Sequence, residues 1–117
     1  MTTTDRLQLV RDSYRAFSTA DRDLIESVLA AQLVFSAPPD PHLDRDGWFE
    51  RCWPGAGGVA AFELVRLAEV GDEVLVTYHA TRADGTRFRN TELFGFADDR
   101  IARIEVYFGW DLDTIEG

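Results

Sequence analysis

Glu92 and His79 are the residues best suited to acid–base chemistry, and they lie on two neighbouring runs of alternating residues. Asp84-Gly85 separates these runs, and such a pair between alternating runs predicts a hairpin with a two-residue loop. In that register His79 faces Asn90 and Thr77 faces Glu92. Because side chains alternate across a strand, all four side chains then share one face of the hairpin.

The ends of this face are apolar, since Leu75, Phe88 and Phe94 lie there. A polar centre inside an apolar frame is typical of a small-molecule pocket. Burial and a nearby imidazole shift the pKa of a carboxyl group in opposite directions. Pairs of groups whose pKa values are shifted in this way are candidates for acid–base catalysis. Glu92 and His79 are therefore the candidate acid and base. The alternative is a buried polar pair that only fixes the strand register.

The last predicted strand, at about 100–110, presents an apolar face made of Ile104, Val106, Phe108 and Trp110. A three-residue loop at Asp98-Asp99 places Val106 opposite Glu92. A two-residue loop would place Glu105 there and set two carboxylates side by side, which is unfavourable. We therefore expect the longer loop, and with it an apolar wall beside Glu92.

A helical first half and a strand-rich second half must position these residues, which indicates an α+β architecture. The spacing of apolar residues predicts a helix from Thr4, its expected N-cap, to about Ser18. A second short helix follows Asp21, a short strand covers 33–35, and a loop leads to Asp44, which begins a third short helix. Four long strands are predicted at about 61–70, 73–83, 86–97 and 100–110.

The length of 117 residues and the 45% hydrophobic content fit one globular domain spanning 1–117. A net charge of -9 argues against nucleic acid and anionic membranes as partners. One cysteine and two histidines offer no disulfide framework and no ordinary metal-ligand set, so we expect no metal and no cofactor. The N-terminus lacks the apolar core of a signal peptide, which predicts a cytoplasmic protein.

The order of elements resembles the nuclear transport factor 2-like superfamily, in its SnoaL-like and ketosteroid isomerase-like branch. The residues that carry this resemblance are Tyr14-Arg15-Ala16-Phe17, Ala20-Asp21 and the runs 90–96 and 100–105. The resemblance implies a cone-shaped, cystatin-like α+β fold. In that fold three N-terminal helices pack on a strongly curved, mostly antiparallel sheet and enclose a pocket. It also implies that the Glu92 face is concave, and that a homodimer forms through the convex face that carries Arg87 and Arg89.

The same resemblance assigns a role to Glu92, which stands where ketosteroid isomerases place the protonated acid of their oxyanion hole. The sequence departs from that family at two other positions. Ala37 replaces the proton-shuttling aspartate, and the oxyanion tyrosine aligns with Ser13 rather than with Tyr14. One residue is a rotation of about 100° on a helix, so Tyr14 belongs to a different position.

The predicted function is a cofactor-independent isomerase, cyclase or dehydratase that moves protons on a small hydrophobic carbonyl compound of polyketide, terpenoid or steroid-like type. Its predicted catalytic residues are Glu92, His79 and Asn90. The residues expected to bind the ligand are Tyr14, Trp48, Trp53, Thr77, Phe88, Phe94, Val106, Phe108 and Trp110. The alternative is a non-catalytic ligand-binding or dimerisation module of the same fold.

Overall fold

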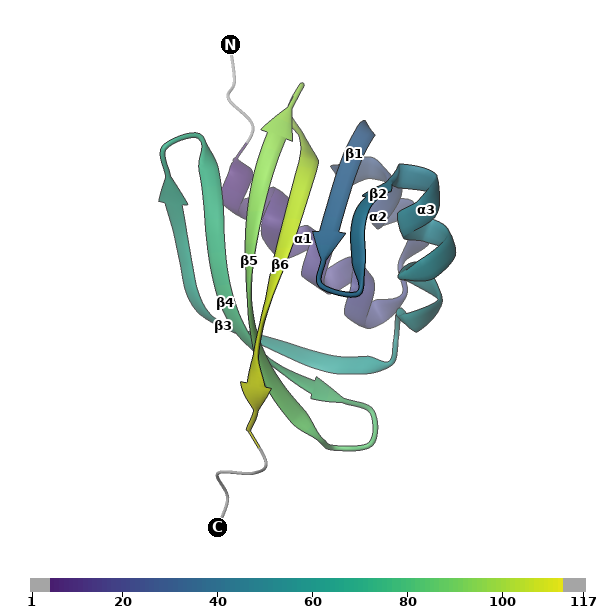
Figure 1. The fold of residues 1–117 in the computed structure, drawn as a ribbon, viewed down its shortest axis with the longest axis vertical. Coiled ribbons are helices and arrows are strands. Elements are labelled where there is room, and N and C mark those ends of the chain that lie inside the picture. Colours follow the sequence, from purple (N-terminus) through teal and green to yellow (C-terminus); the bar gives the residue numbers. More distant parts are fainter. Residues whose placement is uncertain (1–4, 113–117) are drawn as a thin grey trace.

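A computed structural model describes residues 5–112, with only the backbone described for Asp40 and Pro41. Three helices lie against one face of a six-stranded sheet (Figure 1). The helices are α1 (Arg6–Thr19), α2 (Arg22–Val28) and α3 (Arg45–Arg51), followed by a short 3₁₀ turn, η1 (Trp53–Gly55). The strands are β1 (Leu29–Ala37), β2 (Asp40–Asp44), β3 (Val59–Val70), β4 (Glu73–Arg82), β5 (Arg87–Ala97) and β6 (Arg100–Asp111).

The strands are ordered β2-β1-β6-β5-β4-β3, and every neighbouring pair is antiparallel except β1 and β6. The sheet curls without closing and wraps around α1 (Figure 1). This confirms the predicted α+β fold with three helices on a curved, mostly antiparallel sheet. The strand β2 was wrongly predicted as a loop. It is a short strand at the edge of the sheet, where a proline is tolerated because its missing N–H is not needed by a neighbour.

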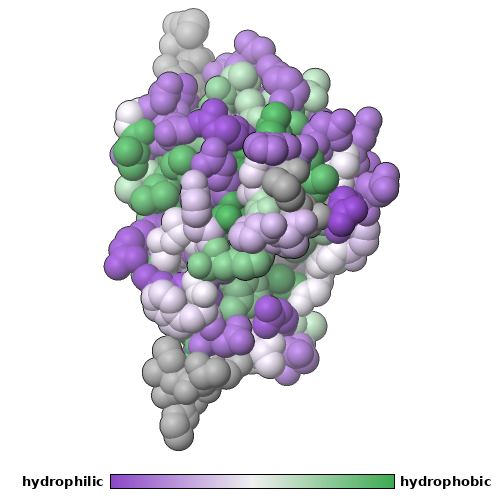
Figure 2. Space-filling view, viewed as in Figure 1, coloured by the Kyte–Doolittle hydropathy of each residue, from purple (hydrophilic) through white to green (hydrophobic). Residues whose placement is uncertain are grey.

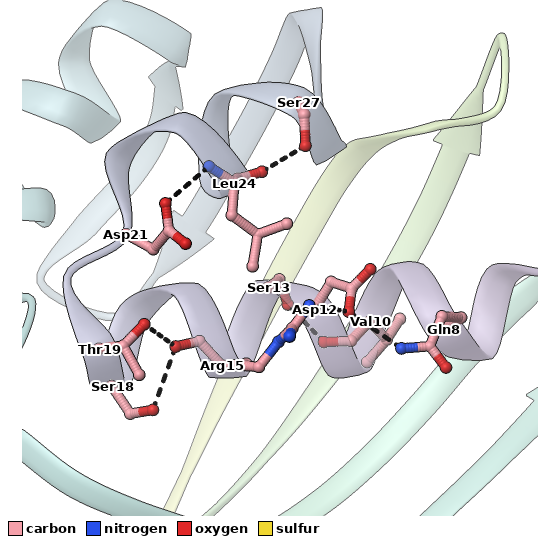
Figure 3. Close-up of polar contacts among 10 residues, drawn as sticks. All are labelled: Gln8, Val10, Asp12, Ser13, Arg15, Ser18, Thr19, Asp21, Leu24 and Ser27. Atoms are coloured by element: carbon pink, nitrogen blue, oxygen red, sulfur yellow. Dashed lines mark hydrogen bonds and ion pairs between the residues drawn. The ribbon is translucent and has the colours of Figure 1, made fainter.

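Aspartates begin all three helices. Asp5, rather than Thr4, caps α1, because its carboxylate accepts hydrogen bonds from the N–H groups of Leu7 (3.1 Å) and Gln8 (3.3 Å). Thr4 lies outside the residues that the structure describes. Asp21 caps α2 by accepting from the Leu24 N–H at 3.1 Å (Figure 3), and Asp44 caps α3, as predicted. Each such cap contributes about 1 kcal/mol to helix stability.

The main core lies between the helices and the concave face of the sheet. The largest fully buried side chains there come from helices and strands alike: Val10, Ile25, Leu29, Leu33, Val74, Val76, Phe94 and Ile101. Burial of each of these side chains stabilises the fold by roughly 1.5–3 kcal/mol relative to exposure. This packing holds α1 against the strands that carry Glu92 and its neighbours.

The β4–β5 hairpin has a three-residue loop, so the predicted register was wrong by one residue. The Gly85 N–H donates to the Arg82 carbonyl at 2.9 Å, and the Arg82 N–H donates to the Thr86 carbonyl at 2.8 Å. Gly85 has a φ of 92°, the left-handed conformation that ends such a loop. His79 therefore pairs with Arg89, and Thr77 pairs with Thr91. A shift of one residue moves every β4 side chain to the opposite face.

The β5–β6 hairpin has the predicted pairing of Glu92 with Val106, but its loop is shorter than predicted. Asp98 and Asp99 have φ values of 52° and 61°, as in a two-residue type I′ loop. A bulge beyond this loop, next to Gly95, then shifts the register by one residue. Val106 consequently lies opposite Glu92, as predicted, although the three-residue loop was wrong. The bulge thereby avoids the pairing of Glu92 with Glu105.

A second bulge near the end of β6 brings Gly109 close to β5. A Cβ atom added at Gly109 would lie 2.2 Å from the carbonyl oxygen of Arg89. No side chain fits there, so only glycine allows this approach of the two strands.

Replacement of Gly109 by alanine is expected to lower the free energy of unfolding by more than about 2 kcal/mol, because backbone must move to admit the methyl group. Gly95→Ala is the matched control. Its Cβ would meet the flexible end of the Arg103 side chain, at 2.8 Å, which can move aside. Urea denaturation of both variants measures the difference. Equal losses of stability would contradict this account of Gly109.

Candidate active site

A carboxyl group with two tyrosine hydroxyls forms the centre of the concave face. Tyr14 on α1 donates a hydrogen bond to Oε1 of Glu92 at 3.0 Å. Tyr78 on β4 donates to Oε2 of the same carboxyl at 2.8 Å. Each carboxyl oxygen therefore has its own phenolic donor, one from a helix and one from the sheet.

Asn90 extends this network toward β6. Its Nδ2 donates to the Tyr78 hydroxyl at 3.3 Å, and its Oδ1 accepts from the Gly109 N–H at 3.1 Å. The backbone at the Gly109 bulge thus fixes which way the amide faces. Hydrogen bonds run in one direction, from Gly109 through Asn90 and Tyr78 to Glu92.

The aromatic rings around the network hold the two hydroxyls in place. Tyr14 packs on Phe62 and on Tyr78, with ring centroids 4.9 and 5.2 Å apart. Tyr78 packs on Phe62 as well, at 5.2 Å. Because Tyr78 pairs with Asn90 across the hairpin, its side chain shares the concave face with Glu92. Packing and register together point both phenols at one carboxyl.

Burial governs the ionisation of this cluster. It raises the pKa of the Glu92 carboxyl above its ordinary value of 4.5, although hydrogen bonds from Tyr78 and Tyr14 act in the opposite direction. Burial, followed by the negative charge of Glu92, raises the pKa of Tyr14 and of Tyr78 well above 10.0. Both phenols therefore remain protonated donors, while Glu92 is the group that can gain or lose a proton.

A cavity of about 260 Å³ adjoins these groups, and Glu92, Tyr14, Tyr78 and Asn90 all line it. Its remaining walls are largely apolar and include Phe17, Trp48, Phe62, Phe88, Phe94 and Val106. Ser13 also lines the cavity, but its hydroxyl donates back to the Val10 carbonyl at 2.7 Å (Figure 3). The Ser13 hydroxyl proton is therefore occupied within α1, and the helix supplies the cavity with the Tyr14 hydroxyl instead.

Most of the residues predicted to line the site do so. The cavity wall contains Tyr14, Trp48, Phe88, Asn90, Glu92, Phe94, Val106 and Phe108. Trp53 instead packs on Phe17 and on Trp48, at centroid distances of 6.0 and 5.9 Å. Trp110 is 58% exposed and lines a neighbouring hollow.

The predicted placement of His79 and Thr77 beside Glu92 was wrong, because both lie on the other face of the sheet. His79 Nε2 lies 2.8 Å from Arg89 Nη1, and its Nδ1 lies 4.0 Å from a Glu63 carboxylate oxygen. Thr77 shares a hydrogen bond of 2.9 Å with Thr91. The polar partner of Glu92 on β4 is Tyr78, which sequence reasoning missed. The alternation of Val74, Val76, Tyr78 and Ala80 was the signal that could have found it.

Comparison with known proteins identifies the family. A family model for the SnoaL-like domain matches residues 10–104, most of the chain. The chain belongs to the SnoaL-like domain family. A search of curated proteins finds no match.

Several solved structures share the fold of this SnoaL-like domain. A putative polyketide cyclase from Sinorhizobium meliloti is 24% identical, with a TM-score of 0.71 over 85% of this chain and 93% of that one. A putative ketosteroid isomerase from Kribbella flavida is 16% identical, with a TM-score of 0.73 over 87% and 76%. A LEH-like epoxide hydrolase from M. tuberculosis is 20% identical, with a TM-score of 0.70 over 88% and 77%. At these identities the likeness establishes the fold.

No three His, Cys, Asp or Glu side chains between residues 5 and 112 gather as metal ligands do. No helix in that range is long and apolar enough to cross a membrane.

The raised pKa of Glu92 predicts a pH-dependent stability. The folded protein holds the Glu92 proton more tightly than the unfolded chain does. As the pH rises above about 4.5, the unfolded chain loses this proton first, and the free energy of unfolding falls by up to about 1.4 kcal/mol per pH unit until the folded pKa is passed. Glu92→Gln removes this effect, so the variant should gain stability relative to the wild type over that range.

Urea denaturation of both proteins between pH 4 and pH 8 measures this difference. Glu63→Gln, which removes a carboxyl whose side chain is 74% exposed, controls for the loss of one acidic group. A difference between the wild type and Glu92→Gln that stays constant with pH would contradict the assignment.

Proposed function

We propose that this SnoaL-like protein is a cofactor-independent isomerase, cyclase or dehydratase that moves protons on a hydrophobic carbonyl compound. The observation that carries the proposal is the buried Glu92 carboxyl, held by two tyrosine hydroxyls at the wall of an apolar cavity. A carboxyl with a raised pKa is a stronger base when ionised, and it also keeps a proton closer to neutral pH. Both properties suit a group that must take a proton and then return it.

In the proposed mechanism the ionised Glu92 removes a proton from the carbon next to the substrate carbonyl. The electron pair of the broken C–H bond moves into the carbonyl, which becomes an enolate. The neutral carboxyl then needs one fewer hydrogen bond, so a hydroxyl of Tyr14 or Tyr78 can turn to the enolate oxygen and stabilise its charge. Where the substrate has a β,γ double bond, the intermediate is a dienolate, and Glu92 returns the proton to the γ carbon while the carbonyl re-forms, which completes an isomerisation. Where it has a β-hydroxyl, Glu92 gives the proton to that hydroxyl, which leaves as water as the C–O bond breaks and a Cα=Cβ bond forms.

The relatives support the choice of substrate class. The names of two structural neighbours, a putative polyketide cyclase and a putative ketosteroid isomerase, refer to chemistry on hydrophobic carbonyl compounds. The cavity of about 260 Å³ and its aromatic walls suit a compact ligand with flat apolar surfaces, such as a polyketide, terpenoid or steroid-like ketone.

A second candidate function is ligand binding without turnover. One observation favours it: Glu92 is the single carboxylate in the cavity wall within residues 5–112, and the methyl group of Ala37 lies in that wall. A reaction that requires a separate acid and base would then lack one of them. The first candidate avoids this difficulty because one carboxyl both takes and returns the proton.

Activity assays separate the two candidates. A thermal-shift screen of steroid, terpenoid and polyketide-like ketones first identifies a ligand. With that ligand, Glu92→Gln is expected to lower the turnover number by roughly 10²–10⁴-fold, since the base is lost while the size and shape of the side chain are kept. Tyr14→Phe and Tyr78→Phe should each lower it less, because the other hydroxyl remains.

His79→Gln is the matched control, because it alters a polar side chain of β4 on the opposite face and should keep the wild-type turnover number. Full activity of Glu92→Gln would contradict the catalytic proposal. Ligand binding by the wild type without any reaction product would favour the binding module.

We also propose a cytoplasmic homodimer that forms through the face of the sheet turned away from the helices. Figure 2 shows that hydrophobic patches lie among hydrophilic residues on this side of the molecule. Tyr107 on β6 is 54% exposed, and it pairs across the sheet with Thr91.

Tyr107→Arg is expected to convert the dimer to a monomer in sedimentation equilibrium, because it places a charge on the proposed interface. A monomeric wild-type protein would contradict the dimer.

A further inference from the structure

The volume of the cavity limits the size of the ligand that the protein can hold. An apolar cavity of about 150 Å³ holds one benzene ring, which has about six non-hydrogen atoms. At the same packing, the cavity of about 260 Å³ beside Glu92 holds a ligand of about ten non-hydrogen atoms. Pockets for drug-sized ligands have volumes of roughly 300–1,000 Å³. The cavity therefore suits a ketone with one ring and a short substituent, whereas a four-ring steroid needs more room.

Trp48 is the largest side chain in the cavity wall, and it is only 5% exposed. It comes from α3, which lies beside β1 and β2 (Figure 1). Three rings pack on the indole: Phe49, Trp53 and Phe17, at centroid distances of 5.0, 5.9 and 6.4 Å. Because these rings hold it in place, the indole cannot turn away from the cavity without displacing its neighbours.

A row of aromatic rings runs along the cavity wall from Trp48 to the tyrosines that hold Glu92. Phe17 packs on Phe62 at a centroid distance of 6.5 Å, and Phe62 packs on Tyr14 at 4.9 Å. The rings of Trp48, Phe17, Phe62 and Tyr14 all line the cavity. A ligand whose carbonyl lies beside Glu92 would therefore place its apolar body along these rings, toward Trp48.

Phe108 also lines the cavity, but it cannot set such a limit. Its side chain is 60% exposed. An exposed ring changes its rotamer freely and can move aside for a larger ligand. Trp48 has no such freedom, so the fixed boundary of the cavity is on the side of α3.

We propose that Trp48 determines the size of the ligand, and that the substrate is a one-ring ketone of about ten non-hydrogen atoms whose apolar end lies against the indole. The inference rests on the proposed function, since that function places the carbonyl beside Glu92. It goes further because it narrows the substrate class and names the residue that excludes larger ketones.

Two ketones that differ by one ring test this limit. They are 4-tert-butylcyclohexanone, with one ring, and 4-cyclohexylcyclohexanone, with two. Isothermal titration calorimetry measures their dissociation constants and does not depend on turnover. The wild type is expected to bind the one-ring ketone roughly tenfold more tightly, because a second ring overpacks the cavity.

Trp48→Ala is expected to reverse this order, because the second ring of the larger ketone can occupy the space that the indole leaves. The two-ring ketone should bind this variant roughly tenfold more tightly than it binds the wild type. Trp48→Leu opens less space, is the milder change to the core, and should shift the order in the same direction by a smaller factor.

Trp53→Ala is the matched control. It truncates a tryptophan that packs directly on Trp48, but Trp53 does not line the cavity. It should lose stability, as Trp48→Ala does, and yet keep the wild-type order of the two ketones. The order of affinities thereby separates a role in ligand size from a role in packing alone.

Equal or tighter binding of the two-ring ketone by the wild type would overturn the size limit. The wild-type order in folded Trp48→Leu would overturn the role of Trp48. Failure of the wild type to bind either ketone would overturn both the size limit and the ketone class. Size-selective binding without turnover of any one-ring ketone would instead support the size limit and contradict the catalytic function.

Discussion

The structure of the concave face depends on one interaction, the hydrogen bonding of the Glu92 carboxyl by Tyr14 and Tyr78. A carboxyl buried without donors would destabilise the fold by several kcal/mol. The two phenols satisfy one oxygen each, and they come from different layers of the molecule. The same contacts that make the buried acid tolerable therefore also join α1 to the sheet and place three proton-bearing groups at one cavity.

Much of the fold could be predicted from local sequence signals, because those signals act over a few residues. Asp21 and Asp44 begin helices through hydrogen bonds within one turn, and alternating apolar residues mark the four long strands. The pairing of Val106 with Glu92 was predicted from the repulsion of two carboxylates, and that physical reason holds. The loop was still wrong, since a bulge can change the register as effectively as an extra loop residue.

The candidate site was harder to predict because it depends on the register of one hairpin. The Asp84-Gly85 pair is compatible with both a two-residue loop and the end of a three-residue loop, and only the backbone conformation at Gly85 distinguishes them. The alternation along β4 contained the missing information. Val74, Val76 and Ala80 are fully buried and Tyr78 nearly so, whereas His79 on the other face is partly exposed. The apolar alternation was the better guide, since a face must bury its apolar residues before it can hold polar ones.

The bulge at Gly109 links the fold to the chemistry of the site. The N–H of Gly109 holds the Asn90 amide, which donates to Tyr78, which in turn donates to Glu92. A residue with a side chain could not take this position, because its Cβ would collide with the Arg89 carbonyl. The same bulge lies in the wall of the neighbouring hollow that Trp110 lines. One backbone irregularity thus orients the proton-bearing groups in the cavity and forms part of the wall of the space beside it.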